Sequence, residues 1–127
     1  MKKMLVFLLL VLCTIYTILP VSAEEYKPCS NSLVNSIAKI NISGGQVVAT
    51  GGVTIIIGGS VHITVYLQKK SGSSWVTIAS TSGNSSVQAS ASAEKGSTYR
   101  AKVSYALYNG GNMTDSGTNY SNELTYN

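Results

Sequence analysis

Apolar and polar side chains alternate along most of the chain from residue 37 onward. The clearest stretch, 61–70, has an aliphatic phase and a polar phase: Val61, Ile63, Val65 and Leu67 against His62, Thr64, Tyr66 and Gln68. A period of two is that of a strand with one buried face. A short loop containing Gly72 follows, and residues 75–80 again favour a strand. Residues 61–80 are therefore predicted to form a β-hairpin.

Further strand-like runs are separated by clusters of Gly, Ser and Asn. They cover residues 37–43, 46–50, 53–57, 87–93, 99–108 and 119–126. Gly51-Gly52 is expected to interrupt the strand that precedes it and to permit a bend or a close approach between strands. Ser, Thr and Asn compete with the helical backbone for hydrogen bonds, so this composition argues against helices. Seven or eight short strands with such turns predict an all-β fold, an antiparallel β-sandwich, with a small barrel as the alternative.

The run Val53 to Ile57 reads Val-Thr-Ile-Ile-Ile and is apolar in both phases. Such a run is typical of a strand that is covered on both faces, and a buried central strand is the favoured interpretation. The alternative is an edge strand. Because the run has no charge and a high strand propensity, an edge position would let it pair with another chain.

The first residues have the layout of a secretory signal peptide. Met1-Lys2-Lys3 is basic, residues 4–19 are almost wholly apolar, and Val21-Ser22-Ala23 provides small residues for cleavage. A permanent membrane anchor needs about 20 apolar residues, which is more than this run offers. We therefore expect a helical signal peptide over 1–23 that is removed, a flexible N-terminal arm over 24–36, and a β-sandwich domain over 37–127. The mature protein is expected to be secreted, either extracellular or associated with the cell envelope, with membrane contact only through the signal peptide.

The charge and the cysteine content limit which partners and which cross-links the protein can have. The net charge is +4 with two lysines in the signal peptide, and the remaining basic residues are too scattered for electrostatic binding of nucleic acid. Lys69-Lys70 is interpreted as a solvated strand end, and Arg100 with Lys102 as an outward strand face. Cleavage would leave Cys29 as the sole cysteine, so no intrachain disulfide can form.

Residue types that carry catalysis are sparse. The sole histidine, His62, lies in the polar phase of a regular strand and is interpreted as a solvated surface residue rather than the base of a nucleophilic triad. One His and one Cys far apart do not make a dedicated zinc site. Glu94, Asp115 and Glu123 are scattered, so a pair of glycosidase carboxylates is not indicated. We expect no enzyme activity, no cofactor and no metal.

Two resemblances bear on fold and location. Residues 94–103, Glu-Lys-Gly-Ser-Thr-Tyr-Arg-Ala-Lys-Val, resemble the corner between strands E and F of fibronectin type III and other immunoglobulin-like domains. The resemblance implies that Tyr99 sends its hydroxyl back to an upstream backbone group. The Trp that the family buries in strand B is missing here, so the resemblance supports an immunoglobulin-like sandwich without fixing the topology.

Most of the mature chain is also similar to a family of small secreted proteins of Gram-positive bacteria that has no known activity. The similarity rests on the order of the signal peptide and several short motifs: Ile-Ser-Gly-Gly, 65–70, 71–75, 95–100 and a Tyr-Ser near the end. It implies export to the exterior or the envelope.

A binding surface is the remaining candidate for function. Tyr66, Trp75 and Tyr108 are expected to project from strand faces, where rings amid Ser, Thr and Asn can stack on sugars or anchor a protein. The competing interpretation is that these rings form cross-strand pairs or core, with Trp75 as the principal core ring. The sequence thus favours a secreted, non-enzymatic binding or interaction module, whose partner is a cell-wall glycan or another protein. The alternatives are an antibacterial or toxin-like protein and a self-associating structural component of the envelope.

Overall fold

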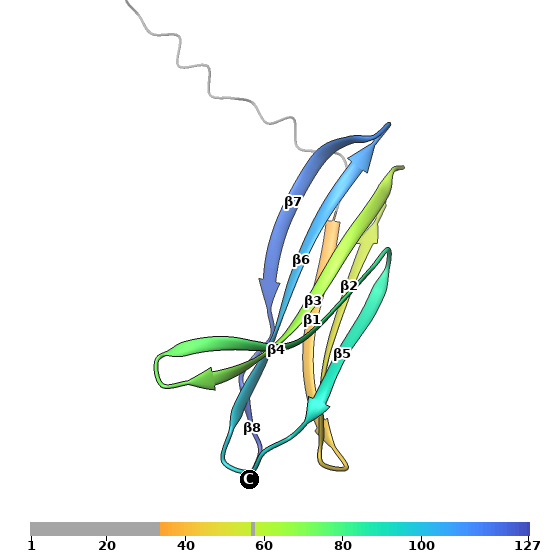
Figure 1. Ribbon diagram of the computed structural model, residues 1–127. Helices are drawn as coiled ribbons and strands as arrows, with labels where there is room; N and C mark the ends of the chain where they lie inside the picture. The colour runs from red at the N-terminus through yellow and green to blue at the C-terminus, as the bar shows by residue number, and fades with distance from the viewer. Residues whose placement is uncertain (1–33, 57) are drawn as a thin grey trace, which may run out of the picture.

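The computed structural model describes residues 34–56 and 58–127, and all regular structure in these residues is β-strand (Figure 1). No helix there is of a length and hydropathy to cross a bilayer. In the described part of the chain the strands are β1 (Val34–Ser43), β2 (Gln46–Ile55), β3 (Ser60–Ser71), β4 (Ser74–Gly83), β5 (Ser86–Ser92), β6 (Thr98–Asn109), β7 (Asn112–Tyr120) and β8 (Leu124–Thr125). The predicted all-β class is confirmed.

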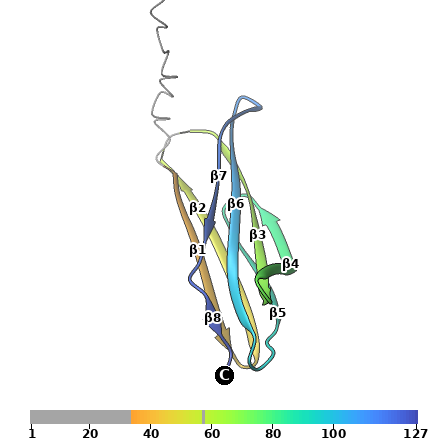
Figure 2. The ribbon, with the colours of Figure 1, turned by 90° about the vertical axis from the view of Figure 1, so that its left-hand side faces the viewer.

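The strands form two antiparallel sheets that pack face to face, as Figure 2 shows from the side. The three-stranded sheet has the order β1-β2-β5. The five-stranded sheet has the order β4-β3-β6-β7, and β8 pairs with β6 beyond the end of β7. Placing the first, second and fifth strands opposite the third and sixth gives the Greek-key connections of an immunoglobulin-like sandwich. The predicted antiparallel sandwich is confirmed.

The core lies between the sheets and follows the predicted alternation. The predicted hairpin is confirmed as β3 and β4, which are joined by a turn at Gly72-Ser73. Side chains from four strands are fully or almost fully buried in the core cluster: Val47, Ala49, Ile63, Val65, Leu67, Ala89, Tyr99, Ala101 and Val103. Burial of each large aliphatic side chain stabilises the fold by roughly 1.5–3 kcal/mol. Tyr99 is the largest of the fully buried residues.

The corner before β6 has the expected tyrosine geometry. The backbone N–H of Glu94 donates a hydrogen bond to the Tyr99 hydroxyl at 2.8 Å. The ring itself is 0% exposed, so the bond satisfies the polar end of a buried side chain. This confirms what the resemblance to immunoglobulin-like domains implied for Tyr99.

Gly51 does not interrupt its strand, contrary to one part of the sequence-based expectation, but the close approach that was also expected there is confirmed. It lies inside β2, which runs unbroken from Gln46 to Ile55. A Cβ at Gly51 would lie 2.7 Å from Val103 Cγ2 and closer still to Val65 Cγ2. The two sheets therefore approach each other at a point where only glycine fits.

The apolar run 53–57 is not a separate strand covered on both faces. Val53 to Ile55 form the end of β2 and pair with the first residues of β1, while Thr54 and Ile56 are exposed. β2 is central in its sheet, but β5 pairs only as far as Gly52, so the run extends past its second neighbour. Val53 N–H still bonds to the Ser85 carbonyl at 3.1 Å. Ile57 lies outside the described residues.

The C-terminal prediction was also wrong in its boundaries. A strand was expected over 119–126, but β7 occupies Asn112–Tyr120 and only Leu124–Thr125 form β8. β7 was missed because most of its side chains are polar and exposed. Its position follows from a tight hairpin in which Gly110 and Gly111 have φ of 59° and 83°, a conformation that glycine adopts without steric cost.

The first strand begins earlier than expected. Residues 34–36 were assigned to the N-terminal arm, but they belong to β1 and pair with Val53 to Ile55 of β2. The side-chain amide of Asn119 in β7 donates a hydrogen bond to the Ser36 carbonyl at 2.9 Å, which connects this end of β1 to the opposite sheet. The predicted signal peptide, the rest of the arm and Cys29 lie outside the described residues.

Candidate binding face

The outer face of the five-stranded sheet carries the polar phase of β3 and β6. The far end of the β3–β4 hairpin projects sideways from the body of the sandwich (Figure 1). The register of β3 and β4 shifts between Leu67 and Gln68, and such a bulge bends a strand and increases its twist. The bent hairpin carries Trp75, which pairs with Lys70.

Trp75 and Arg100 come from strands that are not neighbours. β3 lies between β4 and β6, and strands separated by one neighbour are about 10 Å apart. The guanidinium carbon of Arg100 nevertheless lies 4.2 Å from the centre of the Trp75 ring. The twist of the hairpin therefore lays the ring across β3 onto the outer face.

Arg100 is held on three sides. Its Nε donates a hydrogen bond to Gln68 Oε1 at 2.9 Å, and Gln68 is only 8% exposed. The amide nitrogen of Gln68 in turn donates to Thr77 Oγ1 at 3.4 Å. The ring of Tyr120 in β7 lies 4.5 Å from the guanidinium carbon. Two rings and a buried amide thus fix the position of the guanidinium group.

Two lysines extend this arrangement. Lys70 Nζ is 5.7 Å from the Trp75 ring, and Lys102 Nζ is 5.4 Å from the ring of Tyr66 on the neighbouring strand. Cations at such distances are attracted by the ring quadrupole, by about 0.5–1 kcal/mol each at exposed sites. We call these six residues the ring–cation cluster: Tyr66, Lys70, Trp75, Arg100, Lys102 and Tyr120.

The electrostatics of this face are dominated by positive charge. Among the described acidic residues, Glu123 forms an ion pair with Lys70, in which Oε2 lies 3.7 Å from Nζ. Glu94 is paired with Lys69, and its hydrogen bond to the ammonium group raises the pKa of Lys69 above the ordinary value. Asp115 pairs across the sheet with Leu107, in the buried phase of β6. The cluster therefore contains three cations and meets one carboxylate at its rim.

A row of hydroxyl groups lies next to the cluster on the same face. The residues paired across the four strands are Ser82, Thr64, Ser104 and Thr118. Thr64 and Ser82 share a hydrogen bond of 2.8 Å, and Ser104 and Thr118 share one of 3.4 Å. Hydroxyls can donate and accept, so this row can exchange hydrogen bonds with a polyhydroxylated ligand.

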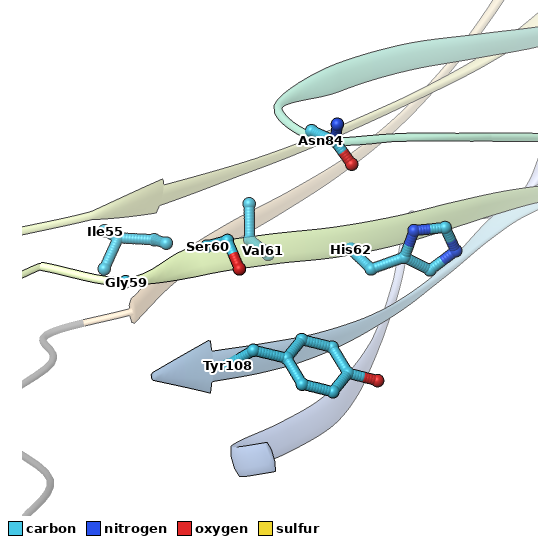
Figure 3. A pocket seen from close by; sticks show the side chains of 7 residues that line it. All are labelled: Ile55, Gly59, Ser60, Val61, His62, Asn84 and Tyr108. Atoms are coloured by element: carbon cyan, nitrogen blue, oxygen red, sulfur yellow. The ribbon is translucent and has the colours of Figure 1, made fainter. Parts of the chain in front are cut away.

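A pocket of about 370 Å³ lies at the other end of the sheet, where β3 begins. His62 and Tyr108 project along one side of it and Asn84 approaches from the β4–β5 turn (Figure 3). His62 is exposed, as the sequence predicted. Tyr108 is six positions beyond Lys102 in β6, about 20 Å along the strand.

The three rings that were predicted to form one binding surface therefore lie in two separate places. Tyr66 and Trp75 belong to the ring–cation cluster, while Tyr108 lines the distant pocket. The interpretation of Trp75 as the principal core ring is wrong, because Tyr99 fills that position. The cluster also satisfies the competing interpretation in part, since its rings pack on cross-strand cations.

Sequence reasoning missed the parts of the cluster that depend on long-range contacts. Arg100 and Lys102 were correctly placed on an outward strand face, but their alignment with rings was not foreseen. Tyr120 was assigned to the final strand instead of the end of β7. The available signal was the alternation of two basic residues with buried ones along 99–103, opposite Tyr66 and Gln68 in a neighbouring strand.

Among residues 34–56 and 58–127, no three His, Cys, Asp or Glu side chains come together as metal ligands. Comparison of the chain with protein-family models and with curated proteins finds no match. The function is therefore inferred from the face itself.

Proposed function

We propose that the protein is a secreted, non-enzymatic binding module that acts at or outside the bacterial envelope and binds a cell-wall glycan. The observation that carries the proposal is the ring–cation cluster on an open sheet face. Tyr120 remains 47% exposed although Arg100 covers part of it. Rings that are held rigidly lose little conformational entropy when a ligand stacks on them.

The neighbouring hydroxyl row supports a sugar ligand in particular. Sugars present apolar C–H faces and polar hydroxyl edges, so a surface that places rings beside Ser and Thr matches both. The hydroxyl row beside the cluster extends across β4, β3, β6 and β7, which suits a long polymer better than a small molecule in an enclosed pocket.

Location outside the cell is supported by the N-terminal pattern of a basic start, an apolar stretch and Val21-Ser22-Ala23. Expression of the full chain in a Gram-positive host should release protein into the medium. Mass spectrometry of that protein should find Glu24 at its N-terminus, and retention of residues 1–23 would contradict removal of the signal peptide.

Binding is tested by cosedimentation of the secreted protein with purified cell walls. The wild type should be retained saturably, and a variant with Tyr66, Trp75 and Tyr120 replaced by Ala should need about tenfold more wall material for the same retention. Tyr108→Ala is the matched control, because it removes a ring on the same face outside the cluster. Equal retention of the triple variant, with circular dichroism showing the same fold, would overturn the proposal.

A second candidate function, self-association as an envelope component, is favoured by one lateral side of the sandwich. Residues 71–93 contain no charged side chain, and they form β4 and β5, which are edge strands of the two sheets. Val76 and Ile78 in β4 are 50% and 39% exposed. Edges without charges are templates for pairing with another chain.

Sedimentation velocity distinguishes this candidate. Sheet-rich assemblies of the wild type that dissociate in the Ile78→Lys variant would support self-association. A wild type that stays monomeric over the accessible concentration range would exclude it and leave the binding module as the proposal.

A further inference from the structure

Resting on the proposed function, we infer that the ligand of the ring–cation cluster is an anionic glycan polymer joined by phosphodiesters, and that Arg100 is its anchor. The first observation is the state of the guanidinium group. In the described part of the chain only its Nε is hydrogen-bonded, to Gln68 Oε1. The two terminal nitrogens, with their four N–H donors, remain for a ligand.

The second observation is that these donors are preorganised. Stacking between Trp75 and Tyr120 and the bond to a buried amide hold the guanidinium plane in place. A free arginine side chain loses about 2 kcal/mol of rotamer entropy when it is fixed. Here folding has already ordered the side chain, so an anion that binds the fork gains more of the interaction energy.

The third observation is the line of charge. Arg100 and Lys102 are alternate residues of one strand, about 7 Å apart, and Lys70 lies two residues beyond Gln68, the partner of Arg100 in the neighbouring strand. A ligand with a single charge would use one of these cations. A polymer with a negative charge in each short repeat can meet all three, so the complementarity favours a repeating polyanion.

The succession of Lys102, Arg100 and Lys70 along β6 and β3 favours phosphodiesters over carboxylates. A guanidinium fork binds either group with two parallel hydrogen bonds. A phosphodiester offers two free oxygens while its ester bonds continue the chain in both directions, so its charges lie within the polymer backbone and can follow a line of cations, whereas a carboxylate on a sugar is a side group. Its sugar or polyol units would then lie over the rings and the hydroxyl row.

The test is calorimetric titration of the secreted protein with a synthetic poly(glycerol phosphate), with dextran as the neutral polymer. Binding to the phosphate polymer that weakens with added salt, and no heat with dextran, is expected. Arg100→Gln should weaken binding by about tenfold or more, and Arg100→Lys should also weaken it because lysine lacks the fork. Lys39→Gln is the matched control, since it removes the same charge from an exposed position in β1 of the other sheet.

Several results would overturn the inference. They are equal binding of dextran, equal losses in Arg100→Gln and Lys39→Gln, tighter binding of polygalacturonate, or equally tight binding of single-stranded DNA. The last two would assign the face to carboxylates or to polyanions in general. Retention on cell walls without binding of the phosphate polymer removes this inference and leaves the proposed function, whereas loss of wall retention removes the proposed function itself.

Discussion

The two faces of the five-stranded sheet come from the same strands but are held together by different interactions. On the inner face Val65, Leu67 and Val103 are fully buried, and their stabilisation comes from removal of apolar area from water. On the outer face, alternate residues of the same strands form ring–cation contacts and hydrogen bonds that remain near solvent. Because those contacts contribute less to folding, the outer face is free to carry binding, while the inner face is constrained by packing.

Substitutions of the adjacent residues Leu67 and Tyr66, one on each face of β3, should give the largest difference in stability between the two faces. Leu67→Ala should lower the free energy of unfolding by about 2–5 kcal/mol, since it leaves a cavity in a dense core. Tyr66→Ala should lower it by about 1 kcal/mol or less. Urea denaturation followed by circular dichroism measures both values. Similar losses for the two variants would show that the faces are not energetically distinct.

Gly51→Ala probes how closely the inner faces of the two sheets approach. The new methyl group would collide with Val65 and Val103, and overpacking of this kind costs about 1–3 kcal/mol. Thermal denaturation should show a lower midpoint. The double variant Gly51→Ala/Val65→Ala should recover part of the loss through coupling of the two sites, and strictly additive losses would contradict the contact.

Tyr99→Phe keeps the buried ring and removes only its hydroxyl. The Glu94 N–H would lose the acceptor that lies 2.8 Å away, and a hydrogen bond of this kind contributes about 1 kcal/mol. Chemical denaturation should therefore show a loss of about that size. An unchanged free energy of unfolding would mean that water replaces the bond at this corner.

The contact between Trp75 and Arg100 should give a smaller effect. A double-mutant cycle with Trp75→Ala and Arg100→Gln is expected to yield a coupling energy of about 0.5–1 kcal/mol. The cycle requires denaturation curves of both single variants, the double variant and the wild type. Zero coupling would show that the ring does not hold the guanidinium group, which would also weaken the argument for preorganisation.

The pair of Lys69 and Glu94 should have the smallest effect, and it should depend on pH. The hydrogen bond to Glu94 raises the pKa of Lys69 above its ordinary value of 10.5. The pair therefore stabilises the folded state in full below that value, and the contribution is lost as the pH rises through the raised pKa. Melting temperatures of wild type and Lys69→Gln should differ slightly at neutral pH and converge at strongly alkaline pH. A constant difference at all pH values would contradict this origin.

The alternation of residue types was sufficient for much of the fold. It identified the hairpin of β3 and β4 and the buried phase of β6, because a period of two and turn residues are local signals. The role of Tyr99 came from the resemblance of residues 94–103 to a corner of immunoglobulin-like domains. The alternation failed for β7, whose polar residues become a strand only by pairing with β6, and for Gly51, whose position inside β2 depends on side chains of the opposite sheet.

The candidate site was predicted only in part, because the sequence pattern carries local signals and not contacts between distant strands. Tyr66 and Trp75 could be chosen as outward rings from the pattern of their own strands. Their grouping with Arg100 and Tyr120 requires the strand order and the bend in the β3–β4 hairpin, and no local pattern contains that information. Tyr108 shares the outward phase of β6 but lies too far along the strand to join them.

The sequence by itself determined that the chain forms strands, which side of the regularly alternating strands β3 and β6 is buried, and which of their residues carry charge and rings on the outside. Only the tertiary structure decided which of those outward residues meet. The face of the sheet to which a side chain points is a local property that follows from the pleat of its strand. Contact across β4, β3, β6 and β7 depends instead on register, twist and the bulge beside Gln68. The position of Arg100 between two rings is a consequence of that assembly.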